Sequence, residues 1–248
     1  MNDKTEGIIL KQSDFKDNDY LLRVITIDQG IISLIAKGAK KTTSKNSYAC
    51  SPLTLTSIIY DQRSSSLHLM QSANIINTYR NIRADLIKVT IATLMCDIID
   101  IIAKEMINED DDFKLLYVLL KESLNHLDQD DSDFIVLGVF ISNILKVMGI
   151  APQVDGCSLC GSSHVVCISI KEGGFLCSNC NIESLNNSVV ELKQFRLLNK
   201  ASCEHITILK QFEPFDFSII TVLYGYLIAY GDINLASWRF LNELVINK

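Results

Sequence analysis

Residues 20–36 are Tyr20-Leu-Leu-Arg-Val-Ile-Thr-Ile27, Asp28-Gln-Gly30 and Ile31-Ile-Ser-Leu-Ile-Ala36. Two runs of branched apolar residues flank a polar tripeptide that ends in glycine, a pattern typical of a β-hairpin. Runs of similar composition occur at residues 7–10, 53–60 and 67–76, and polar stretches separate them. Five short strands within about 80 residues predict a small closed barrel, because closure removes exposed strand edges.

Helical periodicity begins at Ala84, where apolar residues start to recur every three or four positions. It predicts one helix of roughly 20 residues from Ala84 and others over 112–127, 133–148, 191–199, 217–230 and 233–245. Acidic residues at 110–112 and 130–133 precede two of these helices. Because helix N-termini favour negative charge, we interpret them as caps rather than as metal or substrate groups. The predicted fold class is α+β, with a five-stranded β-barrel over residues 1–80 and a helical domain over 81–248.

The formal charge is unevenly divided along the chain. Its total is −6, since 29 acidic residues outnumber 23 basic ones among 248 residues. Through Arg83 there are 11 basic and 7 acidic residues, or +4, whereas the remainder has 12 and 22, or −10. This asymmetry indicates two domains, one of which faces a polyanion. Apolar residues make up 48% of the chain, which excludes a disordered protein.

A basic loop follows the third predicted strand. Four lysines lie within nine positions of it: Lys37, Lys40, Lys41 and Lys45. Such clusters bind phosphate backbones through counterion release, and five-stranded barrels bind single strands in grooves with basic and aromatic groups. Arg23 is a further candidate for this groove. The aromatic candidates, for base stacking or for the core, are Phe15, Tyr20, Tyr48 and Tyr60. The alternative for the lysines is a solvated, mobile loop.

Two Cys-x-x-Cys pairs mark an insert at about residues 151–182. Cys157 and Cys160 form the first pair, Cys177 and Cys180 form the second, and 16 residues separate the pairs. This spacing is typical of a structural zinc site with four thiolate ligands. Four protein ligands leave no open position for water, so we expect one structural Zn²⁺ rather than a catalytic ion.

Other uses of the cysteines remain open. A competing ligand set would join the first pair to His164 and Cys167 and leave the second pair idle. A thioredoxin-like dithiol would need a single motif in a strand–helix context, which the sequence lacks. The remaining cysteines are most simply buried small hydrophobic residues: Cys50, Cys96, Cys167 and Cys203.

Signals for catalysis, secretion and membrane insertion are weak. The four histidines are far apart, and no nucleophile-elbow, zinc-protease or nucleotide-binding motif occurs, so we expect no enzyme. Residues 1–6 begin no apolar signal segment, and the longest uncharged apolar stretch has 15 residues, fewer than the ~20 of a membrane span. We therefore expect a cytoplasmic protein with reduced thiols and no membrane partner.

Several segments also match a known family. They are Gly7-Ile-Ile-Leu10, Asp19-Tyr-Leu-Leu-Arg23, Thr26 to Gly30, Ala36-Lys-Gly-Ala-Lys-Lys41 with Ser44 and Pro52, and Ser237-Trp-Arg-Phe-Leu241. Together with the four-cysteine insert after three helices, they make the chain resemble zinc-bearing members of the bacterial RecO family over essentially its whole length.

The resemblance implies an OB-type barrel, a helical domain with a zinc insert, and no catalytic residues. The family binds single- and double-stranded DNA and anneals complementary strands. With RecR and RecF it loads RecA onto strands coated by single-strand-binding protein, whose C-terminal tail docks on the helical domain. Carried over to this chain, the DNA-contacting residues would be Lys37, Lys40, Lys41, Lys45 and Arg23. The zinc ligands would be Cys157, Cys160, Cys177 and Cys180.

One departure from the family is the −10 charge of the helical domain, which in other members often adds basic residues to the DNA surface. DNA binding is therefore expected to depend mainly on the barrel. Two alternatives stay open. One is a zinc-containing interaction scaffold whose barrel does not touch nucleic acid, and the other is a metal-dependent hydrolase that uses the acidic clusters.

Overall fold

The computed structural model describes residues 2–41, 43–44, 46–62, 67–105, 110–129, 132–212 and 214–247. The chain forms two compact units, Met1–Asp128 and Gln129–Lys248. The first unit therefore contains the barrel together with three helices. The domain boundary that the sequence predicts between residues 80 and 81 lies where strands give way to helices, and it stays a prediction.

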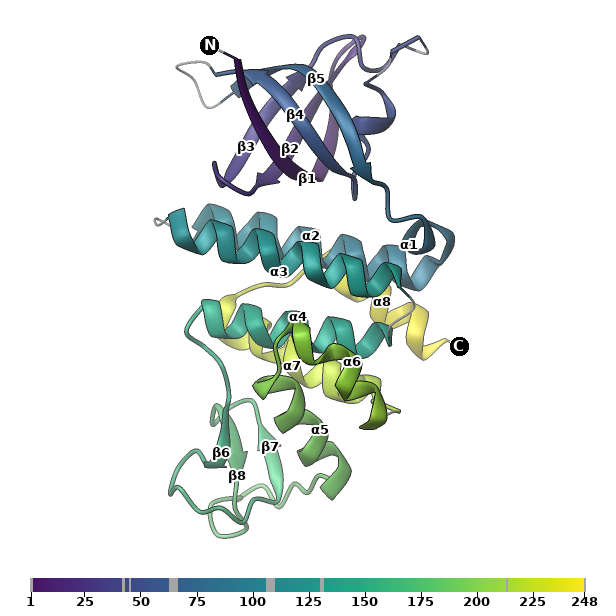
Figure 1. Cartoon of the computed structure of the whole chain (residues 1–248). Helices are drawn as coiled ribbons and strands as arrows, with labels where there is room; N and C mark the ends of the chain where they lie inside the picture. The colour runs from purple at the N-terminus through teal and green to yellow at the C-terminus, as the bar shows by residue number, and fades with distance from the viewer. Residues whose placement is uncertain are drawn as a thin grey trace. The chain divides into compact units, whose positions relative to one another are not determined.

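A closed barrel forms the N-terminal part of the first unit (Figure 1). Its strands are β1 (Asn2–Lys16), β2 (Asp19–Thr26), β3 (Ile31–Ala36), β4 (Leu55–Asp61) and β5 (Leu67–Asn77). They pair in the order β1-β2-β3-β5-β4, and only the β3–β5 pair is parallel. The predicted α+β fold class, with an OB-type barrel and helices, is thereby confirmed.

The segment after β3 packs several of its residues into the barrel core. We call its described residues, 37–41, 43–44 and 46–50, the plug. Ala39, Ala49 and Cys50 are at most 2% exposed and belong to the barrel core, and a short 3-10 helix, η1, spans Tyr48–Cys50. Two backbone N–H groups tie the plug to the β1–β2 turn, because Gly38 N donates to Asp19 Oδ1 at 2.8 Å and Lys40 N donates to Asn18 O at 3.1 Å. The described part of the basic loop is thus packed against the core.

Three helices complete the first unit: α1 (Arg80–Ala84), α2 (Leu86–Glu105) and α3 (Asp110–Asp128). Helix α2 contacts β1, and α3 contacts β2. The β2–β3 turn needs glycine at position 30, where φ is +62° and a Cβ would lie 3.0 Å from the Phe113 ring of α3. Glu6 of β1 accepts hydrogen bonds from Tyr117 Oη at 2.5 Å and Lys121 Nζ at 2.8 Å. Polar contacts therefore join the barrel to the helical pair.

The second unit is mainly helical. Its helices are α4 (Asp133–Val147), α5 (Val189–Lys200), α6 (Ile206–Leu209), α7 (Phe217–Gly231) and α8 (Ala236–Ile246), with 3-10 turns η2 (Cys203–His205) and η3 (Lys210–Phe212). Helix α4 packs against α5, α6 and α7. Gly138 permits this approach, since a Cβ there would meet Leu198 at 2.8 Å and Ile220 at 2.9 Å. The last helix begins three residues later than the pattern predicts, because Leu235, directly before Ala236, has an extended backbone.

A three-stranded sheet forms the insert of the second unit. Strands β6 (Gln153–Cys157), β7 (Cys167–Ser169) and β8 (Gly174–Leu176) pair in the order β6-β8-β7. Two hydroxyls of α7 hold it, as Tyr226 Oη donates to Ser169 O at 2.9 Å and Tyr230 Oη donates to Ile170 O at 2.6 Å. Within the described ranges, no helix is long and apolar enough to cross a membrane.

Candidate nucleic-acid interface and metal centre

Two of the predicted lysines project from the plug into solvent. Lys37 and Lys41 are exposed, and neither forms an ion pair within the part of the chain that the structure describes. Gly38, between them in sequence, has φ of +66°, and Lys41 N donates to Gly38 O at 3.2 Å, so the backbone turns sharply here. The positive charges of Lys37 and Lys41 are therefore exposed to solvent on either side of this turn.

Lys40 has a different environment. Its Nζ forms an ion pair with Asp14 at 2.8 Å, donates to Lys16 O at 3.1 Å and lies 5.4 Å from the centre of the Tyr20 ring. The side chain is only 19% exposed. Lys40 therefore anchors the plug to the end of β1, and Asp14 offsets much of its charge. Lys45 lies outside the described residues.

Arg23 is paired with a buried carboxylate. Its Nε contacts Asp100 of α2, whose side chain is 4% exposed and also accepts from Lys104 Nζ at 2.7 Å. Lys11 lies farther away, with its Nζ 4.0 Å from the same carboxylate. Burial would raise the pKa of Asp100, but the hydrogen bonds from Lys104 and Arg23 outweigh it and lower the pKa. The role of Arg23 in DNA binding stays a prediction. The ion pair shows that Arg23 also has an acidic partner within the chain, Asp100, which the sequence patterns did not reveal.

The aromatic candidates separate into two classes. Tyr60 is 2% exposed and belongs to the barrel core, and Tyr20 is half-buried and packs against that core. Phe15 is 39% exposed and Tyr48 is 80% exposed. Phe15 and Tyr48 are thus the two exposed rings among these four candidates.

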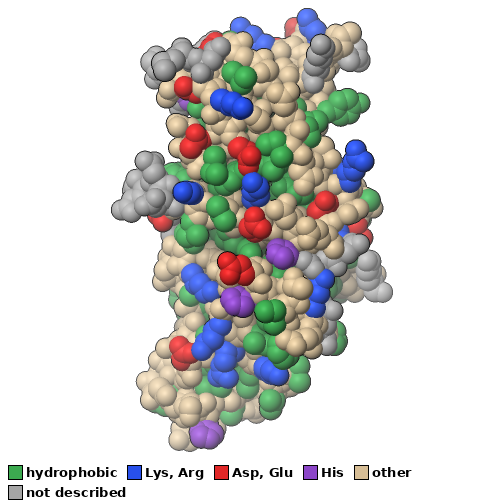
Figure 2. Space-filling model, viewed as in Figure 1, with side chains coloured by type: hydrophobic (Ala, Val, Ile, Leu, Met, Phe, Trp, Pro, Cys, Tyr) green, Lys and Arg blue, Asp and Glu red, His purple; other side chains and the backbone are tan. Residues whose placement is uncertain are grey.

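The surface of the barrel carries both signs of charge. Figure 2 shows basic and acidic side chains interspersed over the barrel on the face in view. Asp14 and Asp19 lie close to the plug, one paired with Lys40 and the other with the Gly38 N–H. The unpaired positive charge of the described loop is thus concentrated in Lys37 and Lys41.

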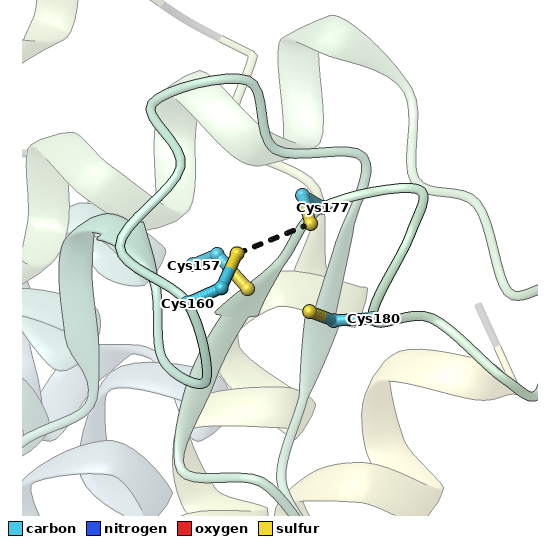
Figure 3. Close-up of side chains that lie close together, drawn as sticks. All are labelled: Cys157, Cys160, Cys177 and Cys180. Atoms are coloured by element: carbon cyan, nitrogen blue, oxygen red, sulfur yellow. Dashed lines mark hydrogen bonds between the residues drawn. The ribbon is translucent and has the colours of Figure 1, made fainter.

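The four predicted zinc ligands come together in the insert (Figure 3). All four Sγ atoms lie within 4.8 Å of one another, and the sulfurs of Cys160 and Cys177 are 3.6 Å apart. A tetrahedral Zn²⁺ with Zn–S bonds of about 2.3 Å needs sulfurs about 3.8 Å apart, so the cluster has the size that zinc requires. In the described part of the chain, His164 is not a member of any such group, so the competing ligand set is not assembled.

Backbone N–H groups support negative charge on these sulfurs. Burial would raise the pKa of Cys157, but backbone hydrogen bonds from Cys177, Cys160 and Leu159 lower it to about 6. A backbone hydrogen bond from Cys180 likewise lowers the pKa of Cys177. The pKa of Cys180 is instead raised to about 12, chiefly by its hydrogen bonds to Cys160 and Cys177, because crowded thiols share protons. A divalent cation would replace those protons, and the cluster could therefore hold one metal ion.

Cys167 is a fifth thiol beside this cluster. It is fully buried in β7 and packs with Cys157 and Cys177. Cys50 and Cys96 are also buried, as small hydrophobic residues would be, whereas Cys203 is half-buried.

A closed OB-type barrel followed by a mainly helical part, with a four-thiol cluster in its insert, defines a class of α+β proteins. Residues 1–79 match the family model for the Recombination protein O N terminal, and residues 83–216 match that for the Recombination protein O C terminal. The chain belongs to the RecO family, and the resemblance seen in the sequence is confirmed.

Curated relatives agree with this assignment. The DNA repair protein RecO of Bacillus pumilus is 29% identical over 245 residues, which cover 97% of this chain and 94% of the relative. The DNA repair protein RecO of Halalkalibacterium halodurans is 25% identical over the same shares of each chain. Since the similarity spans both units, it covers the plug and the cysteine cluster together.

Proposed function

We propose that this chain is a DNA repair and recombination mediator that binds single- and double-stranded DNA, anneals complementary strands and, with RecR, helps load RecA onto DNA coated by single-strand-binding protein. Membership of the RecO family, whose curated relatives are named DNA repair proteins, is the observation that carries this proposal. The exposed Lys37 and Lys41 support a phosphate contact at the plug.

The DNA is proposed to contact the barrel rather than the acidic helices. Charge through Arg83 is +4, whereas charge beyond it is −10, so phosphates are attracted to the barrel and repelled by much of the remaining surface. Lys37 and Lys41 would neutralise phosphates directly, and Lys40 would hold the plug in place through Asp14. Lys45 and Arg23 remain additional candidates for DNA contact.

One structural Zn²⁺ is proposed at Cys157, Cys160, Cys177 and Cys180. The sulfur separations and the backbone N–H groups directed at Cys157 and Cys177 support this ion. When bound, it supplies cross-linking of the insert and no open coordination site. Without the metal, the insert is held by the pairing of β7 with β8 and by hydrogen bonds from Tyr226 and Tyr230 of α7. The metal and α7 would therefore stabilise the same small sheet.

Further parts of the proposal concern partners and location. They are RecR, the C-terminal tail of single-strand-binding protein on the helical part, RecF as a further partner, a cytoplasmic location, and a role without catalysis. The family assignment supports them. Acidic residues start helices here, because α3 begins at Asp110 and α4 at Asp133, which favours the capping interpretation over a hydrolase.

The proposal is tested by DNA binding and strand annealing. We expect the wild-type chain to bind both DNA forms and to anneal complementary strands, and the double variant Lys37→Glu/Lys41→Glu to lose most of both activities. Lys171→Glu is a matched control, because it reverses an exposed lysine of the insert. Equal binding by the wild type and the double variant would refute the plug as the DNA contact.

A second candidate function is an interaction scaffold. Ile182 is 94% exposed, and Leu185 and Val189 are 52% and 82% exposed, so the end of the insert and the start of α5 present apolar side chains of the kind that partner proteins cover. Under this alternative, the wild-type chain would show no DNA affinity at any salt concentration while partner capture remained intact.

A further inference from the structure

We propose that Cys160 and Cys177 form a redox-modification site, at which a peroxide joins the two thiols as a disulfide and the insert releases its metal ion. This inference rests on the proposed zinc site and extends it, because a structural zinc site by itself assigns no chemistry to its sulfurs. Its basis is the position of one exposed thiol against one buried thiol of the other Cys-x-x-Cys pair.

The four thiols of the cluster differ in their access to solvent. Cys157 and Cys177 are buried, and Cys180 is half-buried. Cys160 alone among the four is exposed. Because the susceptibility of a cysteine to oxidation follows its exposure, a small oxidant reaches Cys160 first.

The sulfur of Cys160 lies close to the second pair (Figure 3). It is 3.6 Å from the sulfur of Cys177, so the two atoms need only a small approach to form a disulfide. The backbones of the two pairs are already adjacent, since Cys157 of β6 is the pairing partner of Phe175 in β8. Ser158 N also donates to Phe175 O at 2.8 Å. A bond between the pairs therefore joins segments that the sheet holds side by side.

The reaction balances with hydrogen peroxide as the oxidant. The Cys160 thiolate attacks one peroxide oxygen, the O–O bond breaks, and the products are the sulfenic acid of Cys160 and hydroxide. The Cys177 thiolate then attacks the Cys160 sulfur, the S–S bond forms, and a second hydroxide leaves. Two electrons pass from the two sulfurs to the peroxide. Cys157 and Cys180 then remain as two thiolates, too few for a four-ligand site, so the cluster releases the ion.

The disulfide takes over part of the cross-linking that the ion supplies. It closes a loop of 16 intervening residues, which contains β7 and β8, whereas a bond within either Cys-x-x-Cys pair closes a loop of only two. The longer loop restricts the unfolded chain more strongly. Tyr226 and Tyr230 of α7 still donate to the sheet. The oxidised insert should therefore keep its fold without the metal.

A fifth thiol of the insert serves as an internal control. Cys167 is fully buried in β7 and packs with Cys157 and Cys177. Because buried structural cysteines are unreactive, Cys167 should remain a free thiol while Cys160 reacts. It should accept a thiol label only after the chain is unfolded.

The test treats the zinc-loaded full chain with about two equivalents of hydrogen peroxide. A chromogenic chelator should detect about one released ion per chain, and the mass of the chain should fall by two hydrogen atoms. Peptide mapping without reduction should find Cys160 joined to Cys177, and dithiothreitol followed by added zinc should reverse these changes. Cys203→Ser removes a half-buried thiol outside the cluster and should give the same result.

Other products would overturn the inference. They are a disulfide within either Cys-x-x-Cys pair, a disulfide that contains Cys167, and a sulfinic acid at Cys160 in place of a disulfide. Retention of the ion after peroxide treatment would overturn it as well.

Hydrogen exchange measures how far the disulfide replaces the ion. Amides of β7 and β8 should exchange about 100-fold more slowly in the oxidised metal-free chain than in the reduced metal-free chain, which is prepared with a chelator and dithiothreitol. Equal exchange in the two forms would contradict the proposed cross-link.

The same samples separate this inference from the proposed zinc site. If the reduced chain holds one zinc ion and peroxide yields no bond between Cys160 and Cys177, the modification site is wrong and the zinc proposal stands. If the freshly purified, reduced chain holds no metal, the zinc proposal fails. The modification site then stands only if peroxide joins Cys160 to Cys177 in that metal-free chain.

Discussion

Arg23→Ala should destabilise the first unit. The substitution removes the partner of Asp100, whose side chain is 4% exposed, and leaves a buried carboxylate with fewer hydrogen bonds. Breaking a buried ion pair by truncating one partner costs about 3–5 kcal/mol when nothing else compensates. Here Lys104 still donates to Asp100 at 2.7 Å, and the Arg23 side chain is 28% exposed. Both facts reduce the loss, so we expect about 1–3 kcal/mol in the free energy of unfolding.

The assay must report on the first unit alone. The single tryptophan, Trp238, lies in α8 of the second unit, so its fluorescence does not report on the barrel. Hydrogen exchange of peptides from β2 and α2 should show faster opening by the factor that 1–3 kcal/mol implies, about five- to 150-fold. The Trp238 signal then serves as an internal control. A double-mutant cycle with Asp100→Asn isolates the pair, and its coupling energy should account for most of the loss.

DNA binding decides between the two roles of Arg23. If the residue is structural, the folded Arg23→Ala protein keeps the wild-type dependence of affinity on salt. If it contacts a phosphate, the log–log slope on single strands becomes shallower by about 0.7. A shallower slope together with unchanged exchange in β2 and α2 would refute the structural role.

Three further predictions concern the metal, the packing and the pH dependence. The reduced protein should contain one zinc ion per chain by elemental analysis, and a metal-free wild type would contradict the site. Cys177→Ser should lose the ion and unfold at a lower temperature, whereas the control Cys203→Ser should keep it. Gly138→Ala should cost about 1–3 kcal/mol by urea denaturation, since its Cβ would lie 2.8 Å and 2.9 Å from side chains of α5 and α7, and unchanged stability would refute that packing. Hydrogen bonds, first from Lys121, lower the pKa of Glu6 below its ordinary 4.5; the stability this contributes is present above that value and lost as pH falls through the lowered pKa. Glu6→Gln should therefore reduce the dependence of unfolding on acid pH, and an unaltered acid limb would count against the contact.

The sequence predicts most of the fold because its signals are local. Alternating and continuous apolar runs define the strands, and β3 has the expected bounds, Ile31–Ala36. β1 is much longer than the apolar run at residues 7–10 predicts, because polar residues such as Gln12 and Asp14 pair with β2 outside the hydrophobic pattern. The short helices α1 and α6 have too few residues to show a period. β6 belongs to the insert sheet through pairing with β8, which local composition does not encode.

The sequence predicts the candidate metal site better than the candidate DNA contacts. The four cysteines follow a fixed spacing, and the structure brings their sulfurs together as that spacing predicts. The spacing of the lysines does not show which of them form ion pairs, and Lys40 pairs with Asp14 of β1. Arg23 meets Asp100, which is 77 positions away in the sequence. Such long-range pairs depend on tertiary packing, so the sequence pattern does not reveal which basic residues also have an acidic partner within the chain.

The salt dependence of single-strand binding tests the central claim most directly, namely that the plug contacts DNA phosphates through Lys37 and Lys41. The neutral double variant Lys37→Gln/Lys41→Gln should show a log–log slope that is shallower than wild type by about 1.4, which is two phosphate contacts at about 0.7 each. Lys40→Gln should change the slope far less, because Asp14 already offsets its charge. An unchanged slope in the double variant would contradict the account.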